Sequence, residues 1–251
     1  MRRLLTSGRP ETISTVYDKS ARIYDLLYTG GGIKDYAAEA AELRQIISDA
    51  CPSARTLLDV ACGTGAHLTH LRRWYSVEGA DISPAMLEVA GGRLPGVPLH
   101  LADMRKLDLG RRFDVVTCLF SSIGYITEPA ELQPTIARLA AHVAPGGVLI
   151  LDGWVRPHDW SDTYRGGPDV ASDEEMMVVR LSFSRRVGKV TELDMHHLVR
   201  TESGIDYFVE EHRLALTPTA EYVSAVEATG LKVAVVPFMQ SRDRIVGTRP
   251  Q

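Results

Sequence analysis

The segment at residues 59–65, Asp-Val-Ala-Cys-Gly-Thr-Gly, has the residue types and spacing of a ligand-binding loop. It directly follows a short apolar run, and its glycines let the backbone turn tightly and approach a ligand closely. A helix that begins after the loop would point its first N–H groups at that ligand. The loop lacks the third glycine of a dinucleotide-binding loop, because Leu68 occupies that position, and it lacks the Gly-Lys-Ser/Thr of a P-loop. We therefore expect a nucleoside-like ligand without a pyrophosphate.

Two acids follow the next two apolar runs of the chain, Asp81 after the first and Asp103 after the second. A carboxylate such as Asp81 can accept hydrogen bonds from both hydroxyls of a ribose. Asp103, together with the backbone of Met104, can read the edge of an adenine. Because the carboxyl ends of parallel strands meet at one edge of a sheet, we expect these groups and the 59–65 loop to line one crevice.

The elements that must position these residues alternate between apolar runs and helical stretches, which predicts an α/β fold with a parallel sheet covered on both faces. Three later segments, between residues 177 and 216, instead alternate apolar and polar residues with a period of two and predict an inserted antiparallel meander. Expected strands are 56–61, 77–81, 98–102, 113–119, 148–152, 232–236 and 244–248, and expected helices are 35–50, 66–74, one from Ser83, 130–143 and 219–229.

Composition excludes several classes of protein. The 251 residues include 28 Lys and Arg against 32 Asp and Glu, so the formal charge is −4, and no basic stripe indicates a nucleic-acid partner. No apolar run approaches the roughly 20 residues of a membrane-spanning helix. The three cysteines are far apart, and no histidine pair has a carboxylate or cysteine that completes a metal set, so we expect neither disulfides nor a metal. A polar stretch at residues 7–11 interrupts any export signal, and we expect a cytoplasmic protein.

The 59–65 loop resembles motif I, Asp-x-x-x-Gly-x-Gly, of the class I S-adenosylmethionine-dependent methyltransferases. A closer resemblance, to bacterial N,N-dimethyltransferases of dTDP-linked aminosugars in antibiotic biosynthesis, is carried by residues 24–28, 34–40, 103–105 and 120–125 (Phe-Ser-Ser-Ile-Gly-Tyr). These resemblances imply a Rossmann-like, seven-stranded class I methyltransferase sheet whose last strand is antiparallel, with S-adenosylmethionine as cofactor. The implied cofactor-binding residues are Tyr24, Tyr36, Asp59, Ala61, Gly63, Gly65, Asp81, Ile82, Asp103, Met104 and Phe120.

The resemblance also implies three residues on the acceptor side, Tyr17, Tyr125 and Arg242. Tyr125 stands where similar enzymes usually carry a histidine or a tyrosine. Since the ordinary pKa of a phenol is about 10, we expect Tyr125 to orient an amine rather than act as a base. Tyr17 would close over the site, and the planar fork of Arg242 would clamp a nucleotide diphosphate. The run Asp152-Gly153-Trp154 replaces the Glu-Pro-Trp-Trp of similar enzymes.

The sequence thus predicts an enzyme that methylates the amino group of a dTDP-linked deoxyaminosugar by in-line displacement. Two alternatives stay open: O- or C-methylation of another small natural product, and a protein that binds the cofactor without transferring its methyl group. We expect residues 1–153 and 217–251 to form the cofactor-binding core, with 1–50 as a helical lid. Residues 154–216 would form the inserted subdomain, which either roofs the acceptor pocket or makes a homodimer contact.

Overall fold

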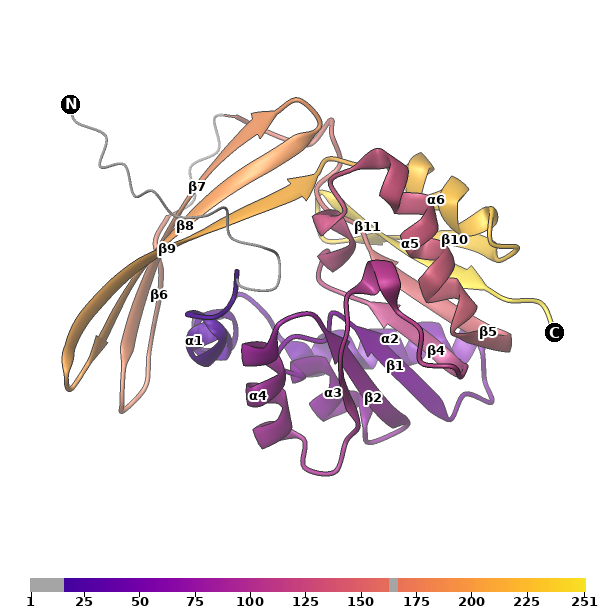
Figure 1. Cartoon of the computed structure of the whole chain (residues 1–251), viewed down its shortest axis with the longest axis horizontal. Coiled ribbons are helices and arrows are strands. Elements are labelled where there is room, and N and C mark those ends of the chain that lie inside the picture. Colours follow the sequence, from indigo (N-terminus) through magenta and orange to yellow (C-terminus); the bar gives the residue numbers. More distant parts are fainter. Residues whose placement is uncertain (1–15, 163–166) are drawn as a thin grey trace.

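The computed structural model describes residues 16–162 and 167–251, which form two β-sheets (Figure 1). The larger sheet has the strand order β10-β11-β5-β4-β1-β2-β3. Strands β1 to β5 are parallel to one another, and β11, the last strand in the sequence, is antiparallel to β5. This confirms the predicted seven-stranded sheet with an antiparallel last strand. The strands are β1 (Thr56–Val60), β2 (Ser76–Asp81), β3 (Leu99–Leu101), β4 (Phe113–Cys118), β5 (Val143–Asp152), β10 (Lys232–Phe238) and β11 (Arg242–Thr248).

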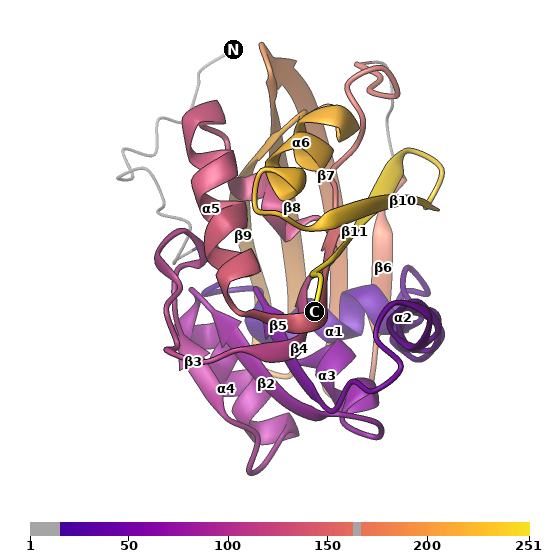
Figure 2. The same ribbon diagram turned by 90° about the vertical axis from the view of Figure 1, so that its right-hand side faces the viewer.

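Helices cover both faces of this sheet, with α5 and α6 on one side and α2 on the other (Figure 2). Neighbouring residues of β5 show why its apolar run is continuous. Leu149 packs with the cluster that includes α5 and α6, whereas Ile150 packs with the cluster that includes α2 and α3. No helix of the described residues is long and apolar enough to cross a membrane. The helices are α2 (Tyr36–Ala50), α3 (Ala66–Leu71), α4 (Pro84–Arg93), α5 (Pro129–Ala141) and α6 (Thr219–Glu227).

The amino-terminal segment lies between the two sheets (Figure 1). It contains the short helix α1 (Ala21–Asp25) and the π-helical turn η1 (Leu26–Gly30). Ile23 and Leu27 are buried against residues of the second sheet, in a cluster that contains Val178 and Val199. This segment therefore connects the cofactor-binding half of the chain to the inserted strands. Residues 1–15 of the predicted lid lie outside the described residues.

The second sheet has four antiparallel strands in the order β6-β7-β8-β9. The sequence predicted the last three, but not β6, which has only four residues. The sheet falls within the predicted inserted range 154–216, and the division of the chain into a core and an inserted subdomain stays a prediction. The strands are β6 (Asp169–Ser172), β7 (Met177–Val187), β8 (Val190–Thr201) and β9 (Gly204–Ala215).

The inner face of the second sheet carries buried polar side chains. Arg180, His197, Glu210 and His212 are each 7% exposed or less, whereas Leu181, the neighbour of Arg180, is 51% exposed. Because buried charges are stable only when they are paired or bind a ligand, these side chains indicate that part of the inner face covers a cavity, beside the apolar cluster of Val178 and Val199.

Candidate active site

The 59–65 loop follows β1 and has a backbone that favours glycine. Ala61, Gly63 and Gly65 all have positive φ, at 59°, 54° and 73°. A Cβ added to Gly65 would lie 2.6 Å from Leu94 Cδ1, so this glycine lets the loop pack directly against the region of α4. A Cβ added to Gly63 would meet no atom within 4 Å. Gly65 thus allows the loop to pack closely against Leu94, whereas Gly63 allows the backbone to turn next to an open space.

Asp81, at the end of β2, holds this loop in place. Its Oδ2 accepts a hydrogen bond from the Gly63 N–H at 2.8 Å, and its Oδ1 accepts one from the Ser83 N–H at 2.9 Å. The residue is 7% exposed, and burial raises the pKa of its carboxyl against the opposing effect of these hydrogen bonds. Each carboxylate oxygen has a second lone pair. Asp81 can therefore hold the loop and still accept hydrogen bonds from ribose hydroxyls.

Two small cavities adjoin the loop and share Ala61 as a lining residue. We call them the loop cavity and the Asp103 cavity. Nine of the eleven predicted cofactor residues line one or both, and the other two, Gly65 and Asp81, position the loop as described above. The loop cavity is lined by Tyr24, Tyr36, Asp59, Ala61, Gly63 and Phe120, among others, and the Asp103 cavity by Ala61, Ile82, Asp103 and Met104, among others.

Asp103 forms an ion pair with Arg105, which the sequence analysis did not predict. Its Oδ1 accepts a hydrogen bond from the Arg105 backbone N–H, and its Oδ2 lies 2.7 Å from an Arg105 guanidinium nitrogen. Burial opposes ionisation of Asp103, but the hydrogen bonds and the charge of Arg105 outweigh it and hold the pKa of the carboxyl below its usual value. Asp103 is therefore a hydrogen-bond acceptor at neutral pH, as binding of an adenine amino group requires.

A third cavity, of about 360 Å³, lies under the second sheet, and we call it the roofed cavity. Its walls come from the amino-terminal segment, the end of β4, the second sheet and the β10–β11 turn. It shares Tyr24, Phe120 and Ser122 with the loop cavity, and Tyr125 with the Asp103 cavity. A ligand in the loop cavity therefore meets a ligand in the roofed cavity at this largely aromatic wall.

Two consecutive residues after β4 have a left-handed backbone conformation, and this turn positions the aromatic wall. Phe120 and Ser121 have φ of 51° and 65°, which costs about 1–2 kcal/mol for each non-glycine residue. The Phe120 N–H donates to Asp152 Oδ2 at 3.0 Å, and the Ser121 hydroxyl donates to the Gly153 carbonyl at 2.7 Å. Asp152 in turn forms a buried ion pair with Arg244, at 2.6 Å. The carboxyl end of β5 therefore fixes the turn.

Arg242 contributes a partly buried positive charge to the roofed cavity. Its guanidinium carbon lies 4.5 Å from the centre of the Trp154 ring, and it donates to the Ser121 hydroxyl at 3.2 Å. Burial lowers its pKa, although the Asp152 carboxylate opposes that shift. Among the described residues no carboxylate forms an ion pair with Arg242, so its remaining donors can bind an anionic ligand.

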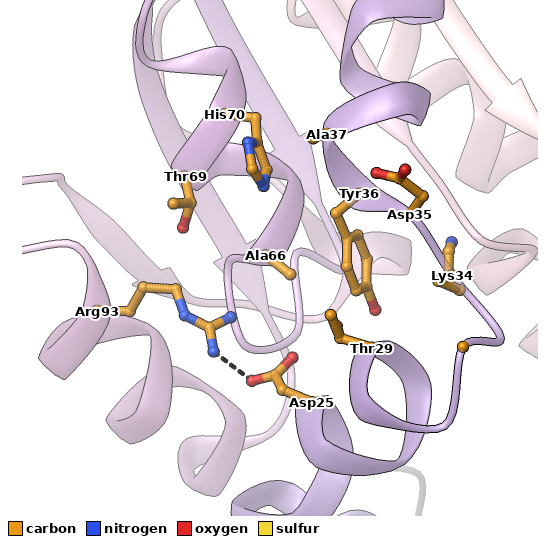
Figure 3. A pocket seen from close by; sticks show the side chains of 11 residues that line it. Asp25, Thr29, Lys34, Asp35, Tyr36, Ala37, Ala66, Thr69, His70 and Arg93 are labelled. Atoms are coloured by element: carbon orange, nitrogen blue, oxygen red, sulfur yellow. Dashed lines mark hydrogen bonds and ion pairs between the residues drawn. The ribbon is translucent and has the colours of Figure 1, made fainter.

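A fourth cavity, of about 540 Å³, lies between the amino-terminal segment, α3 and Arg93 of α4. It shares Tyr36 and Ala66 with the loop cavity. Figure 3 shows Arg93 and Asp25 pointing toward each other across it, where they form an ion pair. Asp25 also accepts a hydrogen bond from the Thr64 hydroxyl at 2.8 Å, and Arg93 donates to the Thr64 carbonyl at 3.1 Å. These contacts join the amino-terminal segment to the 59–65 loop and α4.

The three residues predicted for the acceptor side, Tyr17, Tyr125 and Arg242, all line the roofed cavity. Sequence reasoning missed His212, whose Nδ1 lies 2.7 Å from the Tyr125 hydroxyl oxygen. The period of two in β9 placed His212 on one face, but it did not show that this face is turned inward. His158, a histidine in the segment after β5, has a side chain that is 75% exposed and does not line the roofed cavity. In the described part of the chain no three His, Cys, Asp or Glu side chains are grouped to hold a metal.

Comparison with known proteins places this geometry among methyltransferases. A family described as a methyltransferase domain matches residues 57–147. The chain is 42% identical, over 86% of its own length and 85% of the relative, to dTDP-3-amino-3,6-dideoxy-alpha-D-glucopyranose N,N-dimethyltransferase of Streptomyces fradiae. It is 39% identical to dTDP-4-amino-2,3,4,6-tetradeoxy-D-glucose N,N-dimethyltransferase of Saccharopolyspora spinosa, over 95% and 96% of the two chains.

Among solved structures, the chain resembles CalS10, an amino pentose methyltransferase from Micromonospora echinaspora that is involved in calicheamicin biosynthesis, in its complex with S-adenosylmethionine. The TM-score is 0.81 and the identity is 41%, with 90% of this chain and 96% of the other covered. The likeness therefore extends over the second sheet as well as over the matched domain.

The buried carboxyl of Asp59 generates a prediction about pH. Asp59 is 2% exposed and accepts a hydrogen bond from the Thr117 hydroxyl at 2.7 Å, and burial raises its pKa to about 7. In the unfolded chain an aspartate loses its proton near pH 3.9. The folded state therefore binds more protons between about pH 4 and 7, and the free energy of unfolding should fall as the pH rises through this range.

Asp59→Asn removes this titration. The stability of the variant relative to the wild type should rise by on the order of 2 kcal/mol between pH 5 and pH 8, measured by urea unfolding. The exposed Asp108→Asn serves as the control and should follow the wild type. Parallel pH curves for Asp59→Asn and the wild type would show that Asp59 is ionised throughout this range.

Proposed function

The chain belongs to the family of S-adenosylmethionine-dependent methyltransferases that contains these aminosugar N,N-dimethyltransferases, and we propose that it methylates the amino group of a dTDP-linked deoxyaminosugar. The observation that carries this proposal is the aromatic wall of Tyr24, Phe120 and Tyr125, at which the two cofactor cavities meet the roofed cavity. Arg242 lines the roofed cavity and lies next to the Phe120 ring. Relatives that act on dTDP-aminosugars match most of the chain and support the same substrate class.

The residues around the 59–65 loop fit S-adenosylmethionine. Asp81 offers acceptors for the ribose hydroxyls, and Asp103 offers an ionised acceptor for the adenine amino group. The open space beside Gly63 leaves room for the ligand. S-adenosylmethionine, when bound, supplies a methyl group on a positively charged sulfur. The aromatic rings of Tyr24 and Phe120, which line both cavities, favour such a positive charge.

On the acceptor side, the protein acts mainly by orientation. A neutral amine is already nucleophilic, so its alignment with the methyl group in a cavity closed to water supplies most of the catalysis. The hydroxyls of Tyr17 and Tyr125, 2.5 Å apart, are placed to hydrogen-bond the amine. Arg242 would bind the diphosphate of the nucleotide on the opposite side of Phe120, whose ring centre is 5.9 Å from its guanidinium carbon.

We infer three further properties. The chain acts in the cytoplasm. It binds no nucleic acid, and its formal charge of −4 supports this second property. It also forms a homodimer, and the outer face of the second sheet supports this, because Leu181, Leu198 and Tyr207 are 45–60% exposed there. O- or C-methylation of another natural product, or cofactor binding without transfer, are the alternatives that the following measurement separates.

The purified chain should convert a dTDP-aminosugar and S-adenosylmethionine to N-methylated sugar and S-adenosylhomocysteine. Mass spectrometry of the products, with matched dTDP-sugars that carry an amine or a hydroxyl on the same ring carbon, tests this directly. Only the amino sugar should gain a methyl group. Methylation of the hydroxyl sugar alone would favour an O-methyltransferase. Binding of the cofactor with no product from any sugar would favour a non-catalytic protein.

Asp81→Ala should weaken binding of S-adenosylhomocysteine about 10- to 100-fold, because the ribose loses its acceptor and the loop loses the bond to the Gly63 N–H. Isothermal titration calorimetry measures this, with the exposed Asp108→Ala as the control that should bind like the wild type. Unchanged affinity in Asp81→Ala would remove Asp81 from the cofactor site.

Arg242→Ala should raise the KM for a dTDP-aminosugar about 10- to 100-fold, since the diphosphate loses a cation that has no ion-pair partner. The KM for S-adenosylmethionine should stay within about twofold. Arg185→Ala, a matched change of an exposed arginine on the second sheet, should leave both constants unchanged. The same loss with an aminosugar that has no nucleotide would show that Arg242 does not bind the diphosphate.

A further inference from the structure

A chain of side chains runs from the roofed cavity into the second sheet. The Tyr17 and Tyr125 hydroxyl oxygens are 2.5 Å apart, and the Tyr125 oxygen lies 2.7 Å from His212 Nδ1. His212 Nε2 is 3.7 Å from Glu210 Oε2. Both tyrosines and His212 line the cavity, and the His212 and Glu210 side chains are only 2% and 3% exposed. The cavity is thus linked to a buried imidazole and a buried carboxylate.

The Glu210 carboxylate lies on the Nε2 side of the His212 ring, with Oε2 3.7 Å from Nε2, which is beyond hydrogen-bond distance. Because a nearby carboxylate oxygen favours a proton on the nitrogen that faces it, we assign the ring proton of His212 to Nε2. His212 Nδ1 then accepts from the Tyr125 hydroxyl, and the Tyr125 oxygen accepts from Tyr17. His212 Nε2 and Glu210 Oε1 are buried and have no hydrogen-bond partner among the described residues. Each phenol oxygen keeps a lone pair that can face a ligand.

Neither phenol is suited to hold a negative charge. Burial raises the pKa of both Tyr17 and Tyr125, and their mutual proximity and Glu210 add to this for Tyr17. A phenol with a raised pKa can pass a proton along, because it gives up one proton as it receives another. An imidazole, whose ordinary pKa is about 6.5, is the type of group that can keep the proton.

We propose that His212, positioned by Glu210 and acting through Tyr125, receives the proton that the acceptor amine releases on methylation. This inference rests on the proposed N-methylation. As the nitrogen–carbon bond forms, the carbon–sulfur bond breaks with its electron pair on sulfur, and the nitrogen becomes an ammonium. One proton then moves from this nitrogen to the phenol oxygen of Tyr125, while the proton of that phenol moves to His212 Nδ1. The Glu210 carboxylate stabilises the imidazolium that results.

The surroundings of the His212 ring contain charges of both signs. On the inner face, Glu210 lies on the same strand as His212, His197 lies on the adjacent strand β8, and Arg180 lies on β7, one strand further away. Arg180 forms an ion pair with Asp169 at 2.7 Å, so its charge is largely compensated. The phenol rings of Tyr17 and Tyr125 also contact the His212 ring. Glu210 is thus the negative charge nearest to His212 Nε2 and the group expected to support its protonation.

His212→Asn should lower kcat for the aminosugar about 10- to 100-fold at pH 7, with both KM values changed less than about twofold. The loss should shrink at high pH, where hydroxide from the solvent can take the proton that the methylated nitrogen releases. Glu210→Gln should show the same pH-dependent loss at a smaller size. His196→Asn is the matched control, because His196 is the neighbour of His197 on the outer face, where it contacts Tyr207 at 2.7 Å. A loss that is equal at every pH, or no loss at all, would overturn the relay.

The second measurement needs no turnover. Nitrogen-15 NMR of the histidine rings should show a neutral His212 with its proton on Nε2, and Tyr125→Phe should shift the His212 Nδ1 signal but not that of His196. A proton on Nδ1, or no shift in Tyr125→Phe, would overturn the relay even if the enzyme methylates aminosugars. The expected tautomer in a protein that never methylates an aminosugar would instead refute the proposed function, and with it the purpose of the relay.

Discussion

The buried carboxylate of Asp152 is the constraint on which the geometry of the site depends. Asp152 is 1% exposed and pairs with Arg244, which is 2% exposed. A buried ion pair often adds little stability, because desolvation offsets its attraction, but it holds its neighbours in one arrangement. Here Asp152 accepts the Phe120 N–H and so maintains the left-handed turn at Phe120 and Ser121. That turn places the Phe120 ring between the loop cavity and the roofed cavity.

The amino-terminal segment provides the second constraint, since it contacts both sides of the site. On the cofactor side, Asp25 accepts a hydrogen bond from Thr64 of the loop. On the acceptor side, Leu27 packs against the second sheet, and Tyr28 hydrogen-bonds Arg180 at 2.9 Å. The amino-terminal segment therefore holds the second sheet over the roofed cavity and also contacts the 59–65 loop. A change that displaces this segment should alter both cavities together.

Most of the cofactor side could be predicted from the sequence because its signals are local. Glycine spacing, apolar runs and an acid at a strand end each lie within a few residues, and Asp81 and Asp103 were found in this way. The roofed cavity depends on contacts between distant segments, such as Tyr125 with His212, 87 residues apart. A period of two shows that Glu210 and His212 share a face, but their polarity normally indicates an outward face. Because a cavity reverses that rule here, the sequence pattern could not identify the inner face.

Pairing separates the structural charges of the roofed cavity from those available to a ligand. The Arg180 guanidinium is occupied by Asp169 and Tyr28, and Arg244 is occupied by Asp152. Arg242 differs, because its one hydrogen bond among the described contacts is to the neutral Ser121 hydroxyl. A partly buried cation without an ion-pair partner is costly, so a fold that keeps one gains most when an anion binds. The diphosphate of a nucleotide sugar is an anion of suitable charge, which makes the unpaired state of Arg242 a reason to expect an activated sugar in this cavity and not a free one.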